Sequence, residues 1–256
     1  MPNPQLSVVM PAYNEAGSIR RTLELAHEYL ASRGKPFEVI VVADGDDGTR
    51  EAAAEVGRER GSIAVLGSPG RHGKGHGVRQ GIAAARGDIV GFVDADNKTP
   101  IEELDKLLPW FDERNGSYDL VIGSRALEGS LVEKRQPGYR QVGSKVFAIA
   151  MHVTTGLWEI SDTQCGFKFF RAPVARDLFG RQRVDGYMFD VEILALAVGS
   201  RYRIKEVGIR WADDGDSRLA LVAGNARNMV DLLKIGWRAR VTERAKTLLS
   251  GGRSSI

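Results

Sequence analysis

Continuous apolar runs alternate with helix-like segments through the first half of the chain, and this alternation constrains the fold more than any other feature. The runs hold neighbouring apolar residues, many of them β-branched, which is typical of strands that are covered on both faces. We expect strands at residues 6–10 (ended by Pro11), 37–42, 63–66, 89–93 and 120–124. Helices are expected at residues 19–34, 49–60, 78–85 and from Thr99 onward. This order predicts an α/β fold, with a Rossmann-like, mostly parallel central sheet and helices on both faces.

The helix expected after residue 98 has the clearest start signal. Thr99 is placed as its N-cap, Pro100 as its first residue and Glu102 at the third position, which together form a capping box. The second half of the chain is less regular. We expect helices at 142–155, 191–198 and 219–249 and extended segments at 167–170 and 202–211. Without a repeat or a clear linker, we predict one catalytic domain over 1–218 (halves 1–125 and 126–218) and a C-terminal helix with a polar tail over 219–256.

Three polar loops with acidic residues follow predicted strands, at residues 13–15, 44–47 and 94–98. Ligands of parallel α/β sheets bind beyond the carboxyl ends of the strands, so we expect these loops to share one edge. Asp94 and Asp96 stand two residues apart, where both carboxylates can address one hard divalent cation. Such a cation neutralises charge on a departing diphosphate. The spacing alone leaves open a plain Asp-x-Asp turn before the next helix.

Lys74 lies in the glycine-rich stretch Gly73-Lys74-Gly75-His76-Gly77. Glycines let a backbone approach a phosphate closely, and the helix that follows offers its N-terminus to an anion. The stretch matches neither the dinucleotide fingerprint nor the Walker A loop, and a simple surface loop is the alternative. Asp44 ends the second predicted strand and is placed to accept a hydrogen bond from a base or ribose, unless it only forms the turn.

Composition bounds the class of protein without deciding its function. A formal charge of +3 and a pI near 9.0 suit an anionic substrate or a membrane surface, but also an ordinary basic exterior. Cys165 is the only cysteine, which excludes an intramolecular disulfide and a thiolate zinc cage and fits a reducing cytosol. Signal-peptide features and long apolar runs are missing, so we expect a cytoplasmic protein, soluble or peripheral to the inner face of a membrane.

Seven short motifs follow one another in a characteristic order. They are Pro11-Ala12-Tyr13-Asn14-Glu15, Val41-Val42-Ala43-Asp44-Gly45, Gly73-Lys74-Gly75, Val93-Asp94-Ala95-Asp96, Gly123-Ser124-Arg125, Asp162-Thr163-Gln164-Cys165-Gly166-Phe167-Lys168 and Gly186-Tyr187-x-Phe189-Asp190-Val191-Glu192. The series resembles the family 2 glycosyltransferases with the GT-A fold. The last two motifs resemble its dolichyl-phosphate β-glucosyltransferase and mannosyltransferase branch. The resemblance covers about residues 6–218 and implies a nucleoside-diphosphate sugar donor (UDP- or GDP-hexose), with Mg²⁺ or Mn²⁺ as cofactor.

The resemblance also implies a role for each matching residue. The nucleotide would contact Pro11, Tyr13, Glu15 and Asp44, the metal Asp94 and Asp96, the acceptor Arg125 and Arg140, and the diphosphate Arg218. Arginine suits these last roles because its planar fork pairs two phosphate oxygens. Lys98 stands where some relatives have a glutamine that assists the metal, which predicts fewer protein ligands. Ala43 replaces an acid of some relatives, and the membrane anchors of many relatives are missing.

The reaction implied by the resemblance is an inverting hexosyl transfer, and the acceptor decides which residues it needs. A polyprenyl phosphate is already anionic, so Arg125 and Arg140 would only position it. A hydroxyl of a soluble or polysaccharide acceptor needs a base, and Asp190 or Glu192 is the candidate unless both only complement a helix dipole. We favour the polyprenyl phosphate and expect no nucleic-acid partner. A nicotinamide oxidoreductase would need the dinucleotide fingerprint after the first strand, and a noncatalytic nucleotide-binding protein would lack the metal pair.

The predicted C-terminal helix carries an apolar stripe and many basic residues. The stripe is Val222, Ala226, Met229, Leu233 and Trp237, and the basic residues are Arg227, Lys234, Arg238, Arg240, Arg244 and Lys246. We favour the interpretation in which the stripe packs on the catalytic core and the basic face is solvated. The alternative is a peripheral contact in which residues 237–249 rest on an anionic membrane.

Overall fold

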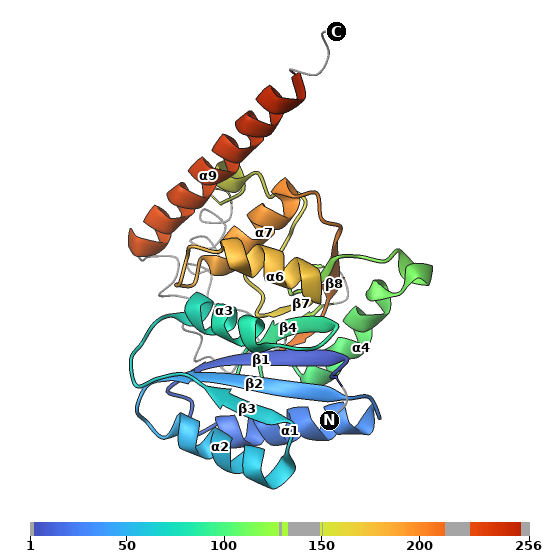
Figure 1. Cartoon of the computed structure of the whole chain (residues 1–256), viewed down its shortest axis with the longest axis vertical. Helices are drawn as coiled ribbons and strands as arrows, with labels where there is room; N and C mark the ends of the chain where they lie inside the picture. Colours follow the sequence, from blue (N-terminus) through green and yellow to red (C-terminus); the bar gives the residue numbers. More distant parts are fainter. Residues whose placement is uncertain (1–2, 128–129, 133–148, 150, 213–225, 252–256) are drawn as a thin grey trace.

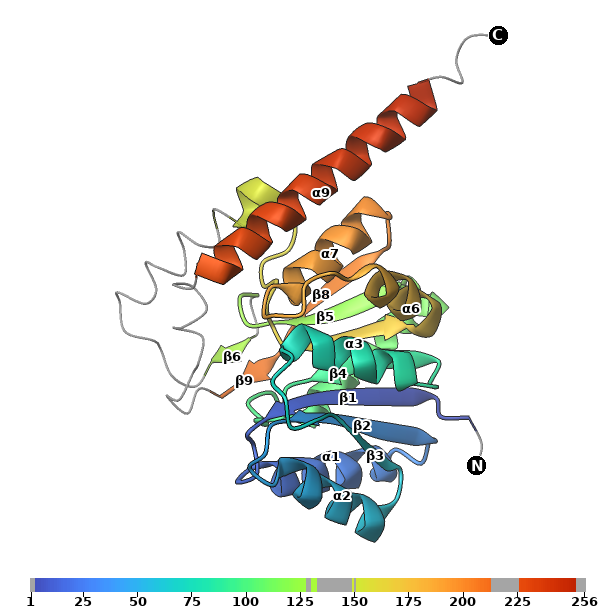
Figure 2. The same ribbon diagram turned by 60° about the vertical axis from the view of Figure 1, so that its left-hand side comes forward.

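The computed structural model describes residues 3–127, 130–132, 149, 151–212 and 226–251. Within these residues seven strands form a central sheet in the order β3-β2-β1-β4-β7-β5-β8 (Figure 1). β6 pairs with β9 beside this sheet (Figure 2). The strands are β1 (Leu6–Tyr13), β2 (Phe37–Asp44), β3 (Ile63–Leu66), β4 (Ile89–Val93), β5 (Leu120–Ser124), β6 (Leu131–Val132), β7 (Phe167–Arg171), β8 (Ile204–Gly208) and β9 (Arg210–Trp211). β7 runs antiparallel to its neighbours β4 and β5, whereas the other pairings are parallel.

Helices cover both faces of this sheet. They are α1 (Ile19–Ser32), α2 (Thr49–Arg60), α3 (Lys74–Ala84), α4 (Leu104–Leu107), α6 (Ala172–Arg181), α7 (Phe189–Gly199) and α9 (Ala226–Gly251). One core lies between the sheet and α3, α6 and α7, and the other between the sheet and α1, α2 and the segment 101–111. Side chains of one strand alternate between the two cores, as Val9 faces the first and Val8 the second. The predicted α/β architecture with a mostly parallel sheet is confirmed.

Two boundary predictions around prolines are wrong. β1 continues through Pro11 to Tyr13, because its pairing with β4 ends at Val9 while its pairing with β2 continues to Asp44. A strand that has lost one neighbour accepts a proline, whose missing N–H then removes little pairing. The capping box at Thr99 does not form either, since Pro100 precedes a 3₁₀ turn (Ile101–Glu103) without a side-chain cap.

Tertiary contacts, and not helix propensity, determine the conformation of the segment after Pro100. Glu103 is buried, and its carboxylate binds the guanidinium of Arg210 at 2.5 Å and the ammonium of Lys106 at 2.6 Å. A second 3₁₀ turn (Leu108–Phe111), with Pro109 in it, follows α4 directly. The expected long helix is therefore a series of short turns that pack against the sheet.

The last helix presents the opposite face from the one predicted. Asn228, Leu232 and Ile235 are buried, whereas Met229, Leu233 and Trp237 of the predicted core-facing stripe are exposed. The favoured interpretation of that stripe is therefore wrong for these three residues; Val222 lies outside the described residues. α9 extends away from the rest of the fold toward the C-terminus (Figure 2). None of the described helices combines the length and apolarity needed to cross a membrane.

Candidate active site

A cleft of about 530 Å³ opens at the carboxyl edge of β1, β2 and β4, which is a typical volume for a small-molecule site. The three polar loops of the sequence meet there, as predicted from the parallel strands. The smaller cleft of about 240 Å³, lined by Leu6, Phe37 and Ile89, lies at the opposite edge, where these strands begin. The predicted site residues that line the larger cleft are Pro11, Tyr13, Glu15, Asp44, Lys74, Asp94, Asp96, Arg125 and Asp190.

Asp94 and Asp96 follow the last residue of β4 and lie side by side in the cleft. Burial and the neighbouring charge of Asp94 raise the pKa of Asp96 above its ordinary value. Two carboxylates that repel each other in this way suit a divalent cation, which relieves the repulsion. No cluster of three or more His, Cys, Asp or Glu side chains suited to a metal is found in the described part of the chain. The pair therefore fits an ion such as Mg²⁺ that takes one or two carboxylates and completes its shell with substrate phosphates.

Gly166 fixes the position of the first of these carboxylates. The N–H of Asp94 donates to the carbonyl of Gly166 at 3.1 Å, and the carboxylate of Asp94 lies where a side chain at 166 would be. Gly166 belongs to one of the seven motifs, but no role was predicted for it. Its role is steric and depends on the pairing of β7 with β4, which the sequence did not indicate.

Lys74 is the first residue of α3, and its ammonium lies 2.5 Å from a carboxylate oxygen of Asp94. Burial lowers the pKa of Lys74, but the carboxylates of Asp94 and Asp190 outweigh this effect and hold the pKa above its ordinary value. A charged ammonium at a helix N-terminus is suited to bind a phosphate group. The glycines also have a packing role that the sequence did not indicate, because a Cβ at Gly73 or Gly75 would meet the carbonyl of Asp185 or Val184.

Asp44 holds a loop and also lines the cleft. Its carboxylate accepts from the N–H of His72 at 3.0 Å and the N–H of Ser68 at 3.4 Å, so it holds the loop before α3. It also lines the cleft beside Tyr13, and the guanidinium of Arg71 stacks 4.6 Å from the centre of the Tyr13 ring. An aromatic ring, a carboxylate and a guanidinium at one end of a cleft can hold a nucleoside.

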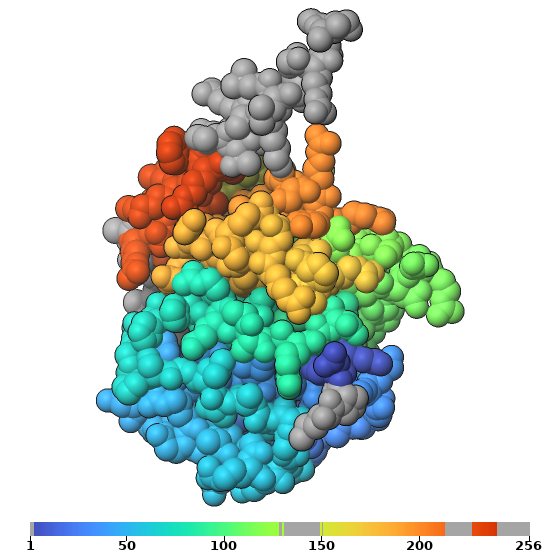
Figure 3. Space-filling view, in the orientation of Figure 1, coloured from blue at the N-terminus to red at the C-terminus, as the bar shows by residue number. Residues whose placement is uncertain are grey.

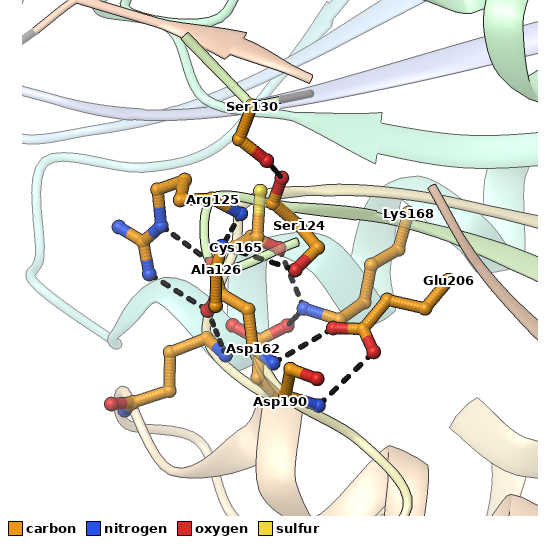
Figure 4. A network of polar contacts seen from close by, with 11 residues as sticks. Ser124, Arg125, Ala126, Ser130, Asp162, Cys165, Lys168, Asp190 and Glu206 are labelled. Atoms are coloured by element: carbon orange, nitrogen blue, oxygen red, sulfur yellow. Dashed lines mark hydrogen bonds and ion pairs between the residues drawn. The ribbon is translucent and has the colours of Figure 1, made fainter. Parts of the chain in front are cut away.

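Arg125 follows β5 and is held by Asp162, which precedes β7 (Figure 4). Its Nε and Nη2 donate to the two carboxylate oxygens at 2.7 and 2.8 Å, and its guanidinium stacks on Trp211. Burial raises the pKa of Asp162, but Arg125 outweighs it and holds the pKa below its ordinary value. Glu206 supports this pair by accepting from the N–H of Asp162 at 2.8 Å. Arg125 therefore lines the cleft with its planar fork already paired to a carboxylate.

The structure separates the two acids that the sequence offered as bases. Asp190 is buried, lines the cleft and accepts from the ammonium of Lys168 at 2.7 Å; burial raises its pKa, against the effect of Lys168. Glu192 points elsewhere, and accepts from the N–H groups of Arg183 and Val184 and from Arg238 of α9. Glu192 therefore has a structural role, and of these two acids only Asp190 lines the cleft.

Lys98, which stands where some relatives have a metal-assisting glutamine, also lines the cleft. Further lining residues had no predicted role at the site. They are Arg71, His72, Thr99, Gln164, Cys165, Tyr187, Trp211, Arg227 and Asn228. Burial raises the pKa of the Cys165 thiol to about 12, so this thiol is no nucleophile at neutral pH. Arg227 and Asn228 belong to α9, and no local sequence signal indicated that this distant helix reaches the cleft. Arg140 and Arg218 lie outside the described residues, so their roles stay predictions.

Comparison with known proteins assigns the family of this site and fold. The chain matches the model of the glycosyl transferase family 2 over residues 7–179. It therefore belongs to this family, and it is a hexosyltransferase with the GT-A fold. Among its relatives, a dolichyl-phosphate beta-glucosyltransferase of Trichomonas vaginalis is 36% identical over 238 residues, with 89% of this chain and 69% of the relative covered. The dolichyl-phosphate beta-glucosyltransferase of Saccharomyces cerevisiae is 32% identical, with coverages of 90% and 73%.

Solved structures agree on the fold. Glucosyl-3-phosphoglycerate synthase from Mycobacterium tuberculosis, in complex with Mn²⁺, UDP and glucosyl-3-phosphoglycerate, superposes with a TM-score of 0.65. The match covers 90% of this chain and 78% of that chain at 20% sequence identity. At this identity the likeness supports the GT-A fold and leaves the substrates of this chain to its own residues.

Proposed function

We propose that this protein transfers glucose, with inversion, from UDP-glucose to a polyprenyl phosphate. The observation that carries the proposal is the convergence of Asp94, Asp96 and Lys74 at one cleft on the carboxyl edge of the sheet. Two carboxylates for a cation and an ammonium at a helix N-terminus form a complementary site for a sugar diphosphate. The names of the dolichyl-phosphate beta-glucosyltransferases support glucose as the sugar and a polyprenyl phosphate as the acceptor.

The nucleotide end of the donor would lie at Tyr13, Asp44 and Arg71. In this arrangement the base stacks near the aromatic ring, and the Asp44 carboxylate accepts from the base or ribose. The diphosphate lies at the start of α3, where Lys74 and the helix N–H groups bind its oxygens. A Mg²⁺ or Mn²⁺ ion at Asp94 and Asp96 would supply Lewis-acid stabilisation of the leaving diphosphate.

A phosphate acceptor removes the need for proton transfer. Its oxygen is already anionic and attacks the anomeric carbon from the side opposite the leaving group, so the protein has only to position it. Arg125 lines the cleft near Asp94, and Arg140 is the second residue proposed for this role. Because Asp162 takes only two of the N–H groups of Arg125, we propose that the remaining guanidinium N–H groups bind the acceptor from a fixed position.

One observation favours a hydroxyl acceptor as the second candidate. Asp190 is a buried carboxylate in the cleft, and its raised pKa brings it closer to the range of a general base. Under that reading Asp190 accepts the hydroxyl proton while Lys168 holds its position. The two candidates make opposite demands on Asp190, since a phosphate acceptor needs no base.

The test compares two acceptors that differ in one group. Protein with radiolabelled UDP-glucose and Mn²⁺ is given a short-chain polyprenyl phosphate or the corresponding polyprenol, and the labelled lipid is separated by chromatography. We expect transfer to the phosphate, with the β-anomer of the product by NMR. Transfer to the polyprenol alone would replace the proposal by the hydroxyl reading. Hydrolysis of UDP-glucose without transfer to either lipid would reject both. Replacing UDP-glucose by GDP-mannose tests the donor.

The place of action follows from the acceptor. We propose that the enzyme works at the cytoplasmic face of a membrane, where nucleotide sugars and polyprenyl phosphates meet. The single buried cysteine and the basic composition support this location. Fractionation of cells that express a tagged chain tests it, and recovery outside the cytoplasm would reject it.

A further inference from the structure

The exposed side of α9 is apolar where it leaves the cleft. Met229, Leu233 and Trp237 recur every four residues and form one stripe along the helix, with Val230 beside it. Leu233 is 57% exposed and Trp237 69% exposed, although both are large apolar side chains. The helix buries its opposite face through Leu232 and Ile235, so the exposed stripe is not needed to attach α9 to the core.

A second segment extends this stripe. Gly236 of α9 packs directly on the backbone of Thr154, so the segment 151–155 crosses the helix at that point. Val153, the neighbour of Thr154, is 57% exposed, and Trp158 is 64% exposed and stacks on His152. Together these side chains form what we call the docking face: Val153, Trp158, Met229, Val230, Leu233 and Trp237.

Basic residues border the docking face. Arg227, Lys234 and Arg238 lie on the flank of α9 next to the apolar stripe. Two acids lie near them, since Lys234 is 3.9 Å from Asp231 and Arg238 binds Glu192 of α7 at 3.2 Å. An apolar stripe with basic residues along its border is typical of helices that lie in the interface of an anionic membrane. Tryptophan is enriched at the headgroup level of membranes, and the docking face carries two. In the space-filling view the described part of α9 forms the red outer surface (Figure 3).

The position of the docking face next to the cleft also favours a membrane as its partner. Arg227 and Asn228 line the cleft, and Met229 begins the docking face at the next residue. A lipid phosphate in the cleft would therefore leave its chain beside an apolar surface. We propose that the docking face binds an anionic lipid bilayer and holds the mouth of the cleft at the headgroup level. This inference rests on the proposed function for its purpose, but binding to lipid is measured without donor or acceptor.

The experiment is co-sedimentation of the whole protein with phosphatidylcholine vesicles that contain increasing phosphatidylglycerol. We expect binding that rises with the anionic fraction and weakens from low to physiological salt. Leu233→Glu should lower the partition coefficient about tenfold or more, because it removes a leucine that enters the bilayer and adds a charge that anionic lipids repel. Val198→Glu is the matched control, since Val198 is 46% exposed at the end of α7, outside the docking face. Its binding should equal that of the wild type.

Other results of these measurements would contradict either the docking face or the proposed function. Equal binding of Leu233→Glu and the wild type would overturn the docking face. A wild-type dimer in light scattering that Leu233→Glu converts to a monomer would make the face a contact between copies of this chain. Transfer to a short, water-soluble polyprenyl phosphate is measured in parallel and should survive Leu233→Glu. Vesicle binding without such transfer in the wild type would reject the proposed function and leave the docking face standing.

Discussion

The carboxylate of Asp94 lies directly against the Cα of Gly166, in the space that a side chain at position 166 would occupy. The contact arises where β4 ends and the antiparallel β7 begins, since Val93 and Phe167 are paired residues. The backbone of the Asp-x-Asp turn is bound to β7 by the hydrogen bond between Asp94 and Gly166. Asp94, one of the two carboxylates proposed to bind the metal, is therefore held from two strands that are far apart in the sequence.

Gly166→Ala should lower turnover about 100-fold, because the added methyl group displaces Asp94 and a shift of about 1 Å costs that much in a positioned site. The measurement is kcat/KM with UDP-glucose at several Mn²⁺ concentrations. Gly180→Ala is the control, because an added Cβ there meets no atom within 4 Å. It should keep activity and raise stability by about 0.5–1 kcal/mol, as alanine is favoured over glycine inside a helix. Wild-type turnover in Gly166→Ala would contradict the steric role.

Asp96→Asn should reduce transfer on the order of 100-fold or more, since one charged ligand of the cation is lost. EDTA should abolish transfer by the wild type, and added Mn²⁺ should restore it. The carboxamide keeps the size of the side chain, so thermal melting should show a folded variant. Transfer that persists in EDTA, or near-normal transfer by Asp96→Asn, would remove the metal from the mechanism.

Lys74→Met should weaken UDP binding roughly tenfold to a hundredfold, because a charged hydrogen bond to the diphosphate disappears. UMP, which lacks the second phosphate, should lose less affinity than UDP. Both affinities are measured by calorimetry in the presence of Mn²⁺. Lys35→Met, an exposed lysine at the opposite edge of the sheet, is the control and should leave both unchanged. Equal losses for UDP and UMP would assign Lys74 to another part of the nucleotide.

Glu38→Gln should weaken the dependence of the free energy of unfolding on pH under acidic conditions. Burial raises the pKa of Glu38, but hydrogen bonds from Ser7 and Arg86 outweigh it and hold the pKa below its ordinary value. A carboxyl with a lowered folded-state pKa stabilises the fold above its unfolded pKa, and this stability is lost as pH falls through the folded-state pKa.

The measurement for Glu38 is the free energy of unfolding between pH 7 and pH 3. Near neutral pH the variant should be about 1–3 kcal/mol less stable, and the difference should shrink below about pH 4.5. Glu159→Gln, at an exposed position, should follow the wild type at every pH. A constant difference across this range would show that Glu38 acts by packing and not by charge.

Arg140→Ala should raise the acceptor KM far more than it weakens UDP binding. Arg140 follows the donor motifs in the sequence, in the stretch between β6 and β7. The residues next to the adjoining ends of β5 and β7, Arg125 and Gly166, both line the cleft. Acceptor kinetics and UDP calorimetry on the same preparation provide the two numbers. A large loss of UDP affinity with unchanged acceptor kinetics would move Arg140 to the donor.

The sequence predicted best where a segment's own pattern decided its structure. α2, β3, β4 and β5 begin and end at the expected residues, because apolar runs and turn residues mark both ends. The direction of β7 was not predicted, since it depends on which strand β7 meets. α6 was missed although Ala175, Leu178 and Phe179 recur at helical spacing. The capping box at Thr99 failed because Glu103 binds Arg210, which is far away in the sequence. Local propensity gives way to such buried contacts.

At the site, too, features set by local sequence were predicted and features set by distant contacts were not. The acidic loops and Lys74 were predicted, because parallel strands bring their carboxyl ends to one edge. The pairing of Arg125 with Asp162 was not, since each motif was interpreted alone and neither indicated a partner. The choice between Asp190 and Glu192 needed the direction of each side chain on α7. Helix spacing alone does not give that direction when both acids fall in the first turn.

The reversed direction of β7 has a consequence for how this architecture diversifies. The chain leaves the sheet at Ser124 and returns at Phe167 on the same edge, with Arg125 and Asp162 binding the two ends together. The described end of the intervening stretch also joins the core, through Met151, Leu157 and Ile160. We expect exchange of residues 126–161 for those of a relative to change acceptor choice and to leave Asp94 and Lys74 in place. A chimera that keeps residues 1–125 and 162–256 of this chain should retain its sugar nucleotide and take the acceptor of the relative that supplies the stretch.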